Sequence, residues 1–312
     1  MLSAISGGVR LNYLAIDLGG TAIKYALMNA DAEILEKSKI KTPVGSDQTI
    51  ADLMEALGNI ILKYHNHIKG IALSLPGVVD STTGYSYSSG AIHYVAENNL
   101  AQLIQEKYNL PVSVENDGKC AALAELWKGS LAHVQNGAVV LLGTGVGGGI
   151  IIDGKLYKGN RFAAGELSFM LSNPAKQAFW GSTGGTPQLL RLTSKKTNVS
   201  VDELDGVKVF EMISAGDKNA LVALDEYTEH LVYQLYNLQA LLDLDVFAIG
   251  GGISQQPILM EYLQKHIDDF CSNHPFRAFM PYIPTPKITT CQFFNDSNLI
   301  GALYHHLSLN QS

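Results

Sequence analysis

Two segments of the chain share one pattern, an apolar strand that runs into a glycine-rich turn and then into a second apolar strand. The segments are "LAIDLGGTAIKYAL" (14–27) and "GAVVLLGTGVGGGIIIDGKLYKG" (137–159). Apolar runs around a glycine pair are typical of a β-hairpin, because glycine adopts the positive φ angles that tight turns need. We expect such angles at Gly19 and Gly20. An architecture that appears twice predicts two domains of similar topology.

Asp17 distinguishes the first hairpin from a plain turn. A carboxylate at the end of a buried strand is costly to desolvate unless it is hydrogen-bonded or meets a cation. One interpretation is a phosphate-binding hairpin, in which the backbone N–H groups of Gly19, Gly20 and Thr21 face an anion and Asp17 lies near its Mg²⁺. The other is an ordinary hairpin, and this segment alone leaves both open.

The composition favours a globular protein of two domains. With 312 residues, the chain exceeds the length at which one hydrophobic core usually keeps growing. Hydrophobic residues make up 46% and charged residues 16%, which is enough for a sizeable core. The formal net charge is -7 and no cluster of Lys and Arg appears, so we expect neither nucleic acid nor a membrane as a partner.

The three cysteines, Cys120, Cys271 and Cys291, lie far apart and form no C-x-x-C pair. They therefore predict neither a disulfide framework nor a zinc site, which fits a reducing compartment. The opening "MLSAISGGVRLN" lacks the apolar core of a signal peptide, and no apolar stretch is long enough to span a bilayer. We expect a cytoplasmic protein.

Strands and helices alternate along much of the chain. Apolar residues recur at helical spacing in segments 49–64, 99–109, 118–130, 220–243, 257–271 and 297–307. Further strands are expected within 32–43, 68–80, 110–117 and 246–250. Segment 170–205 is less periodic, and "GSTGGTP" (181–187) within it is expected to be a loop.

Three glycine-rich turns, at 17–21, 143–149 and 250–252, each follow an apolar strand. Their backbone N–H groups can surround the phosphates of a nucleotide with no side chain in the way. No lysine follows the second turn, as a Walker P-loop would require. The same turn is not followed by a helix pattern, which excludes the Rossmann fingerprint.

Six motifs in this order resemble those of the ROK family of sugar kinases, which have the actin-like ATPase fold. The similarity extends from Asn12 to the last helix. The segments that carry it are "IDLGGTAIK" (16–24), "LPGVVD" (75–80), "VENDGKCAALAE" (114–125), "LLGTGVGGGIIIDGKLYKG" (141–159), "AAGELSFM" (163–170) and "FAIGGGIS" (247–254). The resemblance implies ATP-dependent phosphorylation of a hexose or hexoside hydroxyl, with O6 as the expected acceptor and Mg²⁺ bound to the ATP.

The resemblance also implies the fold class, an α/β, two-domain actin-like ATPase (ribonuclease H-like) fold with duplicated βββαβαβα domains around a central cleft. Residues 1–118 and 296–312 are expected to form a small N-terminal domain. Residues 119–295 are expected to form a large C-terminal domain. A homodimer is expected as well.

The matched positions imply roles for individual residues. Asp117, in "VEND", corresponds to the general base that takes the proton of the attacking sugar hydroxyl. On spacing alone, a cap of the helix that begins near Gly118 would be the better interpretation. Asn116, Glu166 and Gly77 correspond to substrate-binding residues.

Nucleotide binding is expected at the three glycine turns. The residues that the resemblance assigns to it are Asp17, Gly19, Gly20, Thr21, Lys24, Gly143, Thr144, Gly145, Gly250, Gly251 and Gly252. Lys24 has a second interpretation, because it could be a surface charge at a strand edge with no contact to phosphate.

The chain departs from the family pattern after Glu166. Phe169 stands where most members have a zinc-binding histidine, and no cysteine occurs between Cys120 and Cys271. Zinc prefers Cys and His ligands, so no zinc is expected. Phe169 and Trp180 could stack on an aglycone or a second sugar, and the chain is similar here to zinc-free β-glucoside kinases. Phe169 could equally fill the space that zinc leaves.

Glucose or a β-glucoside is therefore the favoured substrate, and N-acylmannosamine kinase is an alternative. A sugar-sensing repressor would need a winged helix before Asp17, where we expect no room for one. An actin-like chaperone or filament protein would need no sugar-binding residues, whereas Asn116, Asp117 and Glu166 are all present.

Overall fold

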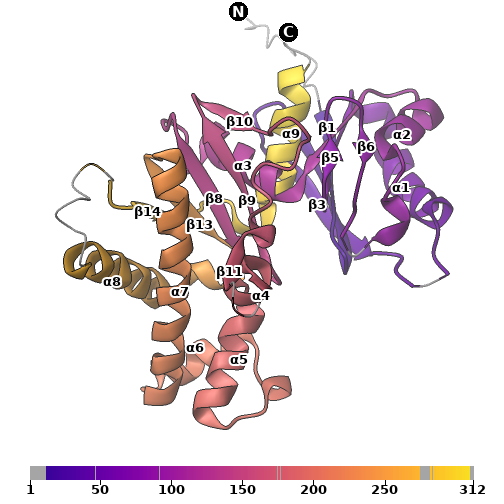
Figure 1. Ribbon diagram of the computed structural model, residues 1–312. Coiled ribbons are helices and arrows are strands. Elements are labelled where there is room, and N and C mark those ends of the chain that lie inside the picture. Colours follow the sequence, from indigo (N-terminus) through magenta and orange to yellow (C-terminus); the bar gives the residue numbers. More distant parts are fainter. Residues whose placement is uncertain are drawn as a thin grey trace, which may run out of the picture. The chain divides into compact units, whose positions relative to one another are not determined.

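The computed structural model describes residues 12–309 except for 46, 91, 174, 176, 275–281 and 283. The opening segment, for which no signal peptide is predicted, lies almost wholly outside the described residues. The chain divides into two compact units (Figure 1). Unit 1 comprises Met1–Leu123 and Asn298–Ser312, and unit 2 comprises Ala124–Ser297.

Unit 1 is built on a five-stranded sheet with the strand order β3-β2-β1-β4-β7. Strands β1 to β3 are antiparallel, whereas β1, β4 and β7 are parallel. The strands are β1 (Asn12–Leu18), β2 (Ala22–Asn29), β3 (Ile34–Lys41), β4 (Ile71–Leu75) and β7 (Val112–Asn116). A small hairpin of β5 (Val79–Asp80) and β6 (Tyr85–Ser86) follows β4.

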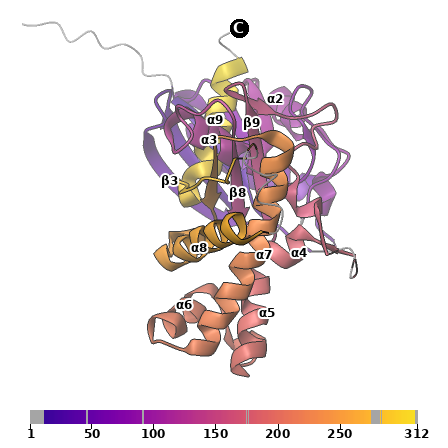
Figure 2. The ribbon, with the colours of Figure 1, turned by 60° about the vertical axis from the view of Figure 1, so that its left-hand side comes forward.

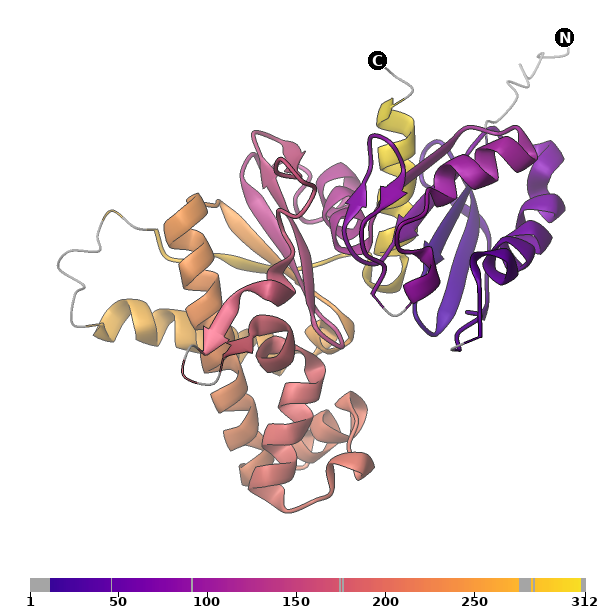
Figure 3. The same ribbon diagram turned by 45° about the vertical axis from the view of Figure 1, so that its right-hand side comes forward.

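Four helices pack on this sheet: α1 (Ile50–Tyr64), α2 (Leu100–Tyr108), α3 (Asp117–Lys128) and α9 (Ser297–Leu309). Helices α1 and α2 cover one face, where Leu14 and Ile16 of β1 belong to the same buried cluster as Leu53 and Leu57 of α1 (Figure 3). The other face carries α3 and α9, which approach each other so closely that a methyl group at Gly301 would overlap a backbone carbonyl of α3.

Unit 2 repeats the topology of unit 1. Its sheet has the order β10-β9-β8-β13-β14, again with an antiparallel half and a parallel half. The predicted duplication is therefore confirmed. The strands are β8 (Gly137–Leu142), β9 (Val146–Ile152), β10 (Lys155–Tyr157), β13 (Val246–Gly250) and β14 (Ile288–Thr290).

The helices of unit 2 are α4 (Trp180–Gly184), α5 (Thr186–Thr197), α6 (Gly206–Ser214), α7 (Lys218–Leu242) and α8 (Pro257–Asn273). They pack beside this second sheet and on one another, and α5 and α6 lie farthest from the sheet (Figure 2). A short hairpin of β11 (Leu171–Asn173) and β12 (Ala178–Phe179) precedes α4. None of the described helices is both long and apolar enough to cross a membrane.

The prediction of a loop at 181–187 is wrong, because α4 and the first turn of α5 occupy this segment. Trp180, the first residue of α4, is 1% exposed and lies in the core of unit 2. The buried hydroxyl of Tyr227 donates a hydrogen bond to the carbonyl of Gly184 at 2.7 Å. Tertiary contacts thus stabilise a helix in a glycine-rich segment that has little helical propensity of its own.

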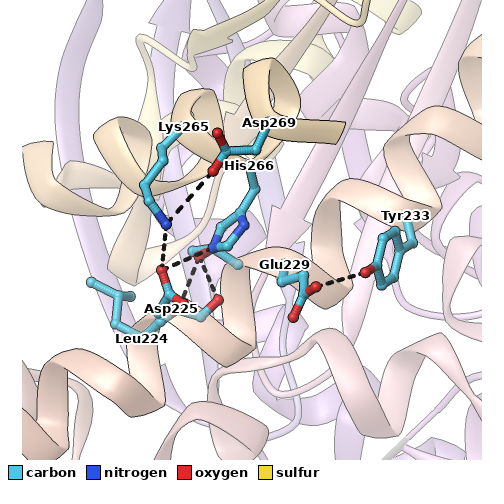
Figure 4. A network of polar contacts seen from close by, with 8 residues as sticks. Leu224, Asp225, Glu229, Tyr233, Lys265, His266 and Asp269 are labelled. Atoms are coloured by element: carbon cyan, nitrogen blue, oxygen red, sulfur yellow. Dashed lines mark hydrogen bonds and ion pairs between the residues drawn. The ribbon is translucent and has the colours of Figure 1, made fainter. Parts of the chain in front are cut away.

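A polar network connects α7 and α8 (Figure 4). Asp225 accepts hydrogen bonds from Lys265 Nζ at 2.9 Å and from His266 Nε2 at 3.1 Å. Glu229 accepts one from the hydroxyl of Tyr233, and this bond, together with burial, raises the pKa of Tyr233 to about 12. The side chains of Asp225 and Lys265 are about half exposed, so we expect this network to orient the helices more than to stabilise them.

The contact between α3 and α9 gives a test of packing in unit 1. A methyl group at Gly301 would overlap the carbonyl oxygen of Cys120, and backbone cannot move aside without separating the helices. We expect Gly301→Ala to lower the free energy of unfolding by about 1–3 kcal/mol or more. Denaturant unfolding followed by circular dichroism measures this.

The matched control is Gly206→Ala. A methyl group there would meet no atom closer than Ile253 Cγ2 at 3.3 Å, so its cost is expected to be small. Equal stability of Gly301→Ala and the wild type would show that α3 and α9 do not pack as described.

Candidate active site

The β1–β2 turn is held by the strand that follows it. The N–H of Gly19 donates to the carbonyl of Ala22 at 3.1 Å, and the buried Thr42 hydroxyl donates to the carbonyl of Gly19 at 2.6 Å. The backbone angles differ from the prediction, because neither Gly19 nor Gly20 is among the glycines with positive φ. Small size is what the turn needs at Gly19, where a Cβ would lie 3.0 Å from the carbonyl of Ala22. Thr21 completes the turn.

Asp17 is 5% exposed, and its carboxylate is held mainly by neutral donors. Oδ1 accepts hydrogen bonds from Ser74 Oγ at 2.8 Å and from Asn298 Nδ2 at 3.0 Å. Lys24, directly opposite on β2, places Nζ 3.9 Å from Oδ2, and its side chain is 40% exposed. A lysine so exposed contributes little stability by this pairing.

Asn116 and Asp117 lie where β7 ends and α3 begins. Asn116 is 4% exposed, and its Nδ2 donates to the carbonyl of Gly77 at 2.8 Å and to Asp117 Oδ1 at 3.0 Å. Its Oδ1 accepts the N–H of Lys119 at 3.0 Å, which is the geometry of a helix N-cap. The cap of α3 is therefore Asn116, and the partly exposed Asp117 is oriented by Asn116 and by the N–H of Gly118.

Gly77 is a position that only glycine fits. Its φ is +88°, and a Cβ would overlap the carbonyl of Ser88. The neighbouring Val78 donates its N–H to Ser88 Oγ at 2.9 Å, so the segment after β4 packs closely against residues 86–90. This packing brings Gly77 within hydrogen-bonding distance of Asn116 and joins the two predicted substrate motifs of unit 1.

The second glycine turn joins β8 and β9 in unit 2. Gly143 and Thr144 are exposed there, and the N–H of Gly143 donates to the carbonyl of Gly145 at 3.1 Å. Ser168 fixes the end of the turn, because its Oγ accepts the N–H of Val146 at 3.1 Å. The turn therefore exposes backbone with few side chains, as a phosphate-binding loop requires.

The third turn lies beside the second. Strand β13 runs parallel to β8 and ends at Gly250, which pairs with Leu141. Gly251 has a φ of +94°, and a Cβ on it would overlap Leu142, the last residue of β8. A Cβ on Gly252 would meet no atom within 4 Å. The structure thus brings together the two nucleotide motifs that the sequence predicts in unit 2.

Glu166 precedes a 3-10 turn (Leu167–Phe169) and is partly exposed. Phe169 is 69% exposed, and its ring lies 6.4 Å from that of Phe179, which is 49% exposed. Phe179 pairs with Leu171 in the β11–β12 hairpin, and Leu171 is 51% exposed. Phe169, Leu171 and Phe179 together form an apolar surface, which we call the hairpin patch.

The expectation that Trp180 adds to an aromatic surface is wrong. Its side chain is 1% exposed and belongs to the core, and its indole Nε1 has no hydrogen-bond partner among the described residues. Phe169 has the opposite environment. Its exposure argues against a role as filler of a vacated zinc site, because such a filler would be buried.

Several residues that hold the site were not identified from the sequence. Ser74 and Asn298 bind Asp17, Thr42 binds the first turn, and Ser168 binds the second. Ser74 had one available signal, since a serine inside the apolar run "IALSL" requires a polar partner.

A sequence model described as the ROK family matches residues 13–307. The chain belongs to the ROK family. Two curated relatives, from Listeria monocytogenes and Klebsiella pneumoniae, are named beta-glucoside kinase. The Listeria protein is 32% identical over 94% of this chain and 96% of its own length, and the Klebsiella protein is 31% identical over 96% and 97%.

A solved ROK family protein from Streptococcus pneumoniae TIGR4, in complex with sucrose, is 31% identical and has a TM-score of 0.84. It covers 96% of this chain and 99% of its own. The two five-stranded sheets of this chain match that structure, so the predicted actin-like ATPase fold is confirmed.

The metal content of this ROK chain gives a test. The described residues include no group of three or more His, Cys, Asp or Glu side chains that could hold a metal ion, and Cys120 and Cys291 are buried. We expect elemental analysis of the purified protein to find no stoichiometric zinc. Zinc-selective chelation should leave activity intact, whereas removal of Mg²⁺ should abolish it. One zinc per chain would contradict this expectation.

Proposed function

We propose that this ROK chain phosphorylates the O6 hydroxyl of a hexose or hexoside, with a β-glucoside or glucose as the favoured substrate. The chain is an ATP-dependent sugar kinase, the enzyme class of its named relatives. The observation that carries the finer proposal is the arrangement at the end of β7, where Asn116 caps α3 and orients the partly exposed Asp117. A carboxylate oriented in this way is suited to accept a proton.

In the proposed reaction, Asp117 takes the proton of the sugar hydroxyl as that oxygen attacks the γ-phosphorus of ATP. The bond from the γ-phosphorus to the ADP oxygen breaks, and the proton later leaves Asp117 for solvent. Mg²⁺ bound with ATP supplies neutralisation of the developing phosphate charge. Asn116 retains one function toward the sugar, because both N–H groups of its amide are used and Oδ1 can accept a further hydroxyl.

The three glycine turns are the proposed nucleotide-binding elements. In unit 1, Gly20 and Thr21 are proposed to present backbone N–H groups beside Asp17. The N–H of Gly19 is instead bonded to the carbonyl of Ala22, and Gly19 shapes the turn. In unit 2, Gly143–Gly145 and Gly250–Gly252 lie next to each other because β8 and β13 are adjacent. Lys24 is a weaker candidate, because its exposed ammonium already lies near Asp17.

The hairpin patch supports a substrate with an apolar or sugar substituent at the anomeric carbon. The patch lies close to Glu166 in the fold, because the N–H of Phe169 donates a hydrogen bond to the carbonyl of Glu166 at 3.1 Å. Glu166 is the proposed ligand of the sugar ring, so a substituent could stack on the exposed ring of Phe169. The relatives named beta-glucoside kinase agree with this choice.

N-acylmannosamine kinase is the alternative, and a non-catalytic sugar-sensing regulator is a weaker one. Both would use the same residues around Asn116 and Glu166, and the hairpin patch favours a glycoside over either. A homodimer in the cytoplasm completes the proposal. Cys120, Cys271 and Cys291 form no disulfide among the described residues, which agrees with a reducing compartment.

The role of Asp117 is tested by Asp117→Asn. The amide cannot accept the hydroxyl proton, so we expect kcat to fall by about 10²–10⁴-fold. Calorimetry should find dissociation constants for sugar and ATP close to those of the wild type. Asp153→Asn, an exposed aspartate between β9 and β10, is the control and should keep full activity. An Asp117→Asn variant that retains most of its turnover would refute the assignment.

The hairpin patch is tested by Phe169→Ala and Phe169→His. Phe169→Ala removes the stacking ring, so we expect it to lower kcat/KM for cellobiose or an aryl β-glucoside by roughly five-fold, with little change for glucose. Phe169→His is expected to shift the ratio of the two kcat/KM values toward glucose. The control is Tyr157→Ala, which removes another exposed aromatic ring of unit 2 and should change neither substrate. If glucose turns over and every glycoside is inert in the wild type, the proposed role of Phe169 is wrong.

A further inference from the structure

Glu125 is a buried carboxylate with an unusually complete set of donors. It lies in α3 and is 0% exposed. Oε1 accepts the backbone N–H groups of Gln292 at 2.8 Å and Phe293 at 3.2 Å. Oε2 accepts the N–H and the hydroxyl of Ser130, both at 2.8 Å. Burying a charge is costly unless hydrogen bonds replace its water, and these four do so.

The position of Glu125 along the chain is equally specific. Helix α3 starts with Asp117 in unit 1, and the chain enters unit 2 at Ala124, one residue before Glu125. The chain returns to unit 1 at Asn298, shortly after Phe293. The chain passes between the units at two places, within α3 and after Ser297. Glu125 therefore forms hydrogen bonds between the two connecting segments, at their ends in unit 2.

The segment that donates to Glu125 also contacts the third glycine turn. Cys291, next to Gln292, donates its N–H to the carbonyl of Ile249 in β13 at 3.0 Å. A Cβ on Gly250 would lie 2.9 Å from Cys291 Sγ, so the segment and the turn are in close contact. Burial, and then the charge of Glu125, raises the pKa of the Cys291 thiol, which keeps this contact apolar.

We propose that Glu125 is a positioning residue that couples the nucleotide turn of unit 2 to the helix that carries Asp117. A shift of Gly250–Gly252 on nucleotide binding would move Gln292 and Phe293, and their hydrogen bonds to Glu125 would transmit it to α3. The inference rests on the proposed sugar kinase function. An apolar side chain would be sufficient if this position only filled the core. Hydrogen bonds depend on distance and direction, so those of Glu125 respond to a movement of Gln292 and Phe293.

The test is the effect of nucleotide on sugar binding. Calorimetry would measure the dissociation constant of the best sugar substrate with and without a non-hydrolysable ATP analogue. In the wild type, we expect the analogue to tighten sugar binding by about five-fold or more. We call the ratio of the sugar dissociation constants without and with the analogue the coupling factor. In Glu125→Gln, the amide N–H groups would face N–H donors, so we expect the coupling factor to fall toward one. The kcat should fall while KM for ATP changes little.

A second variant keeps the charge. A methyl group at Gly129 would overlap Glu125 Oε2, so Gly129→Ala displaces the carboxylate without neutralising it and should also lower the coupling factor. Val209→Ala, in the buried face of α6, is the control for lost stability and should lower the melting temperature while keeping the coupling factor.

The outcomes separate this inference from the proposed function. If the wild type phosphorylates a sugar and Glu125→Gln and Gly129→Ala keep its coupling factor, Glu125 is only structural and the inference is wrong. It is also wrong if the wild type shows no coupling. If the wild type phosphorylates no sugar, the proposed function fails and the inference falls with it.

Discussion

The parallel register of β1, β4 and β7 determines where the candidate residues of unit 1 lie. Asp17 on β1 faces Ser74 on β4, and the carboxyl ends of parallel strands meet at one edge of a sheet. The glycine turn after β1, Gly77 after β4 and Asp117 after β7 therefore share that edge. Unit 2 has the same strand order, and its two glycine turns follow the adjacent strands β8 and β13. One topology, used twice, positions both sets of motifs.

Most strands, the longest helix and the duplicated sheets could be predicted from the sequence, because each is indicated by a short local pattern of residues. A strand that ends in glycine or in an amide and an acid is visible in a few consecutive residues. The longest helix was expected at 220–243 and is observed as Lys218–Leu242. Repetition of the hairpin pattern predicted the duplicated sheets, and the resemblance to the ROK family supplied the roles that spacing alone did not.

Most failures concern contacts between distant residues. Ser74 and Asn298 hold Asp17 from 57 and 281 positions away, and no local pattern predicts such pairs. Helix α4 escaped prediction because tertiary packing, not periodicity, stabilises a segment rich in glycine and threonine. Helices α5 and α6 bury apolar residues at helical spacing, a signal that was present in the sequence and was not used. Phe169 and Trp180 looked alike in the sequence, yet one is exposed and the other is in the core, because burial depends on the β11–β12 hairpin between them.

The surroundings of two buried acids differ in a way that supports the nucleotide-binding role proposed for Asp17 and the positioning role proposed for Glu125. All four donors of Glu125 are fixed by backbone or by one serine, and they occupy both of its oxygens. In the described part of the chain, Asp17 accepts its two hydrogen bonds at Oδ1, and the one cation paired with Oδ2 there is Lys24, with Nζ at 3.9 Å. A carboxylate compensated on one oxygen keeps a negative charge that can attract a hydrated cation. Glu125 has no such capacity, so its charge can only hold protein to protein.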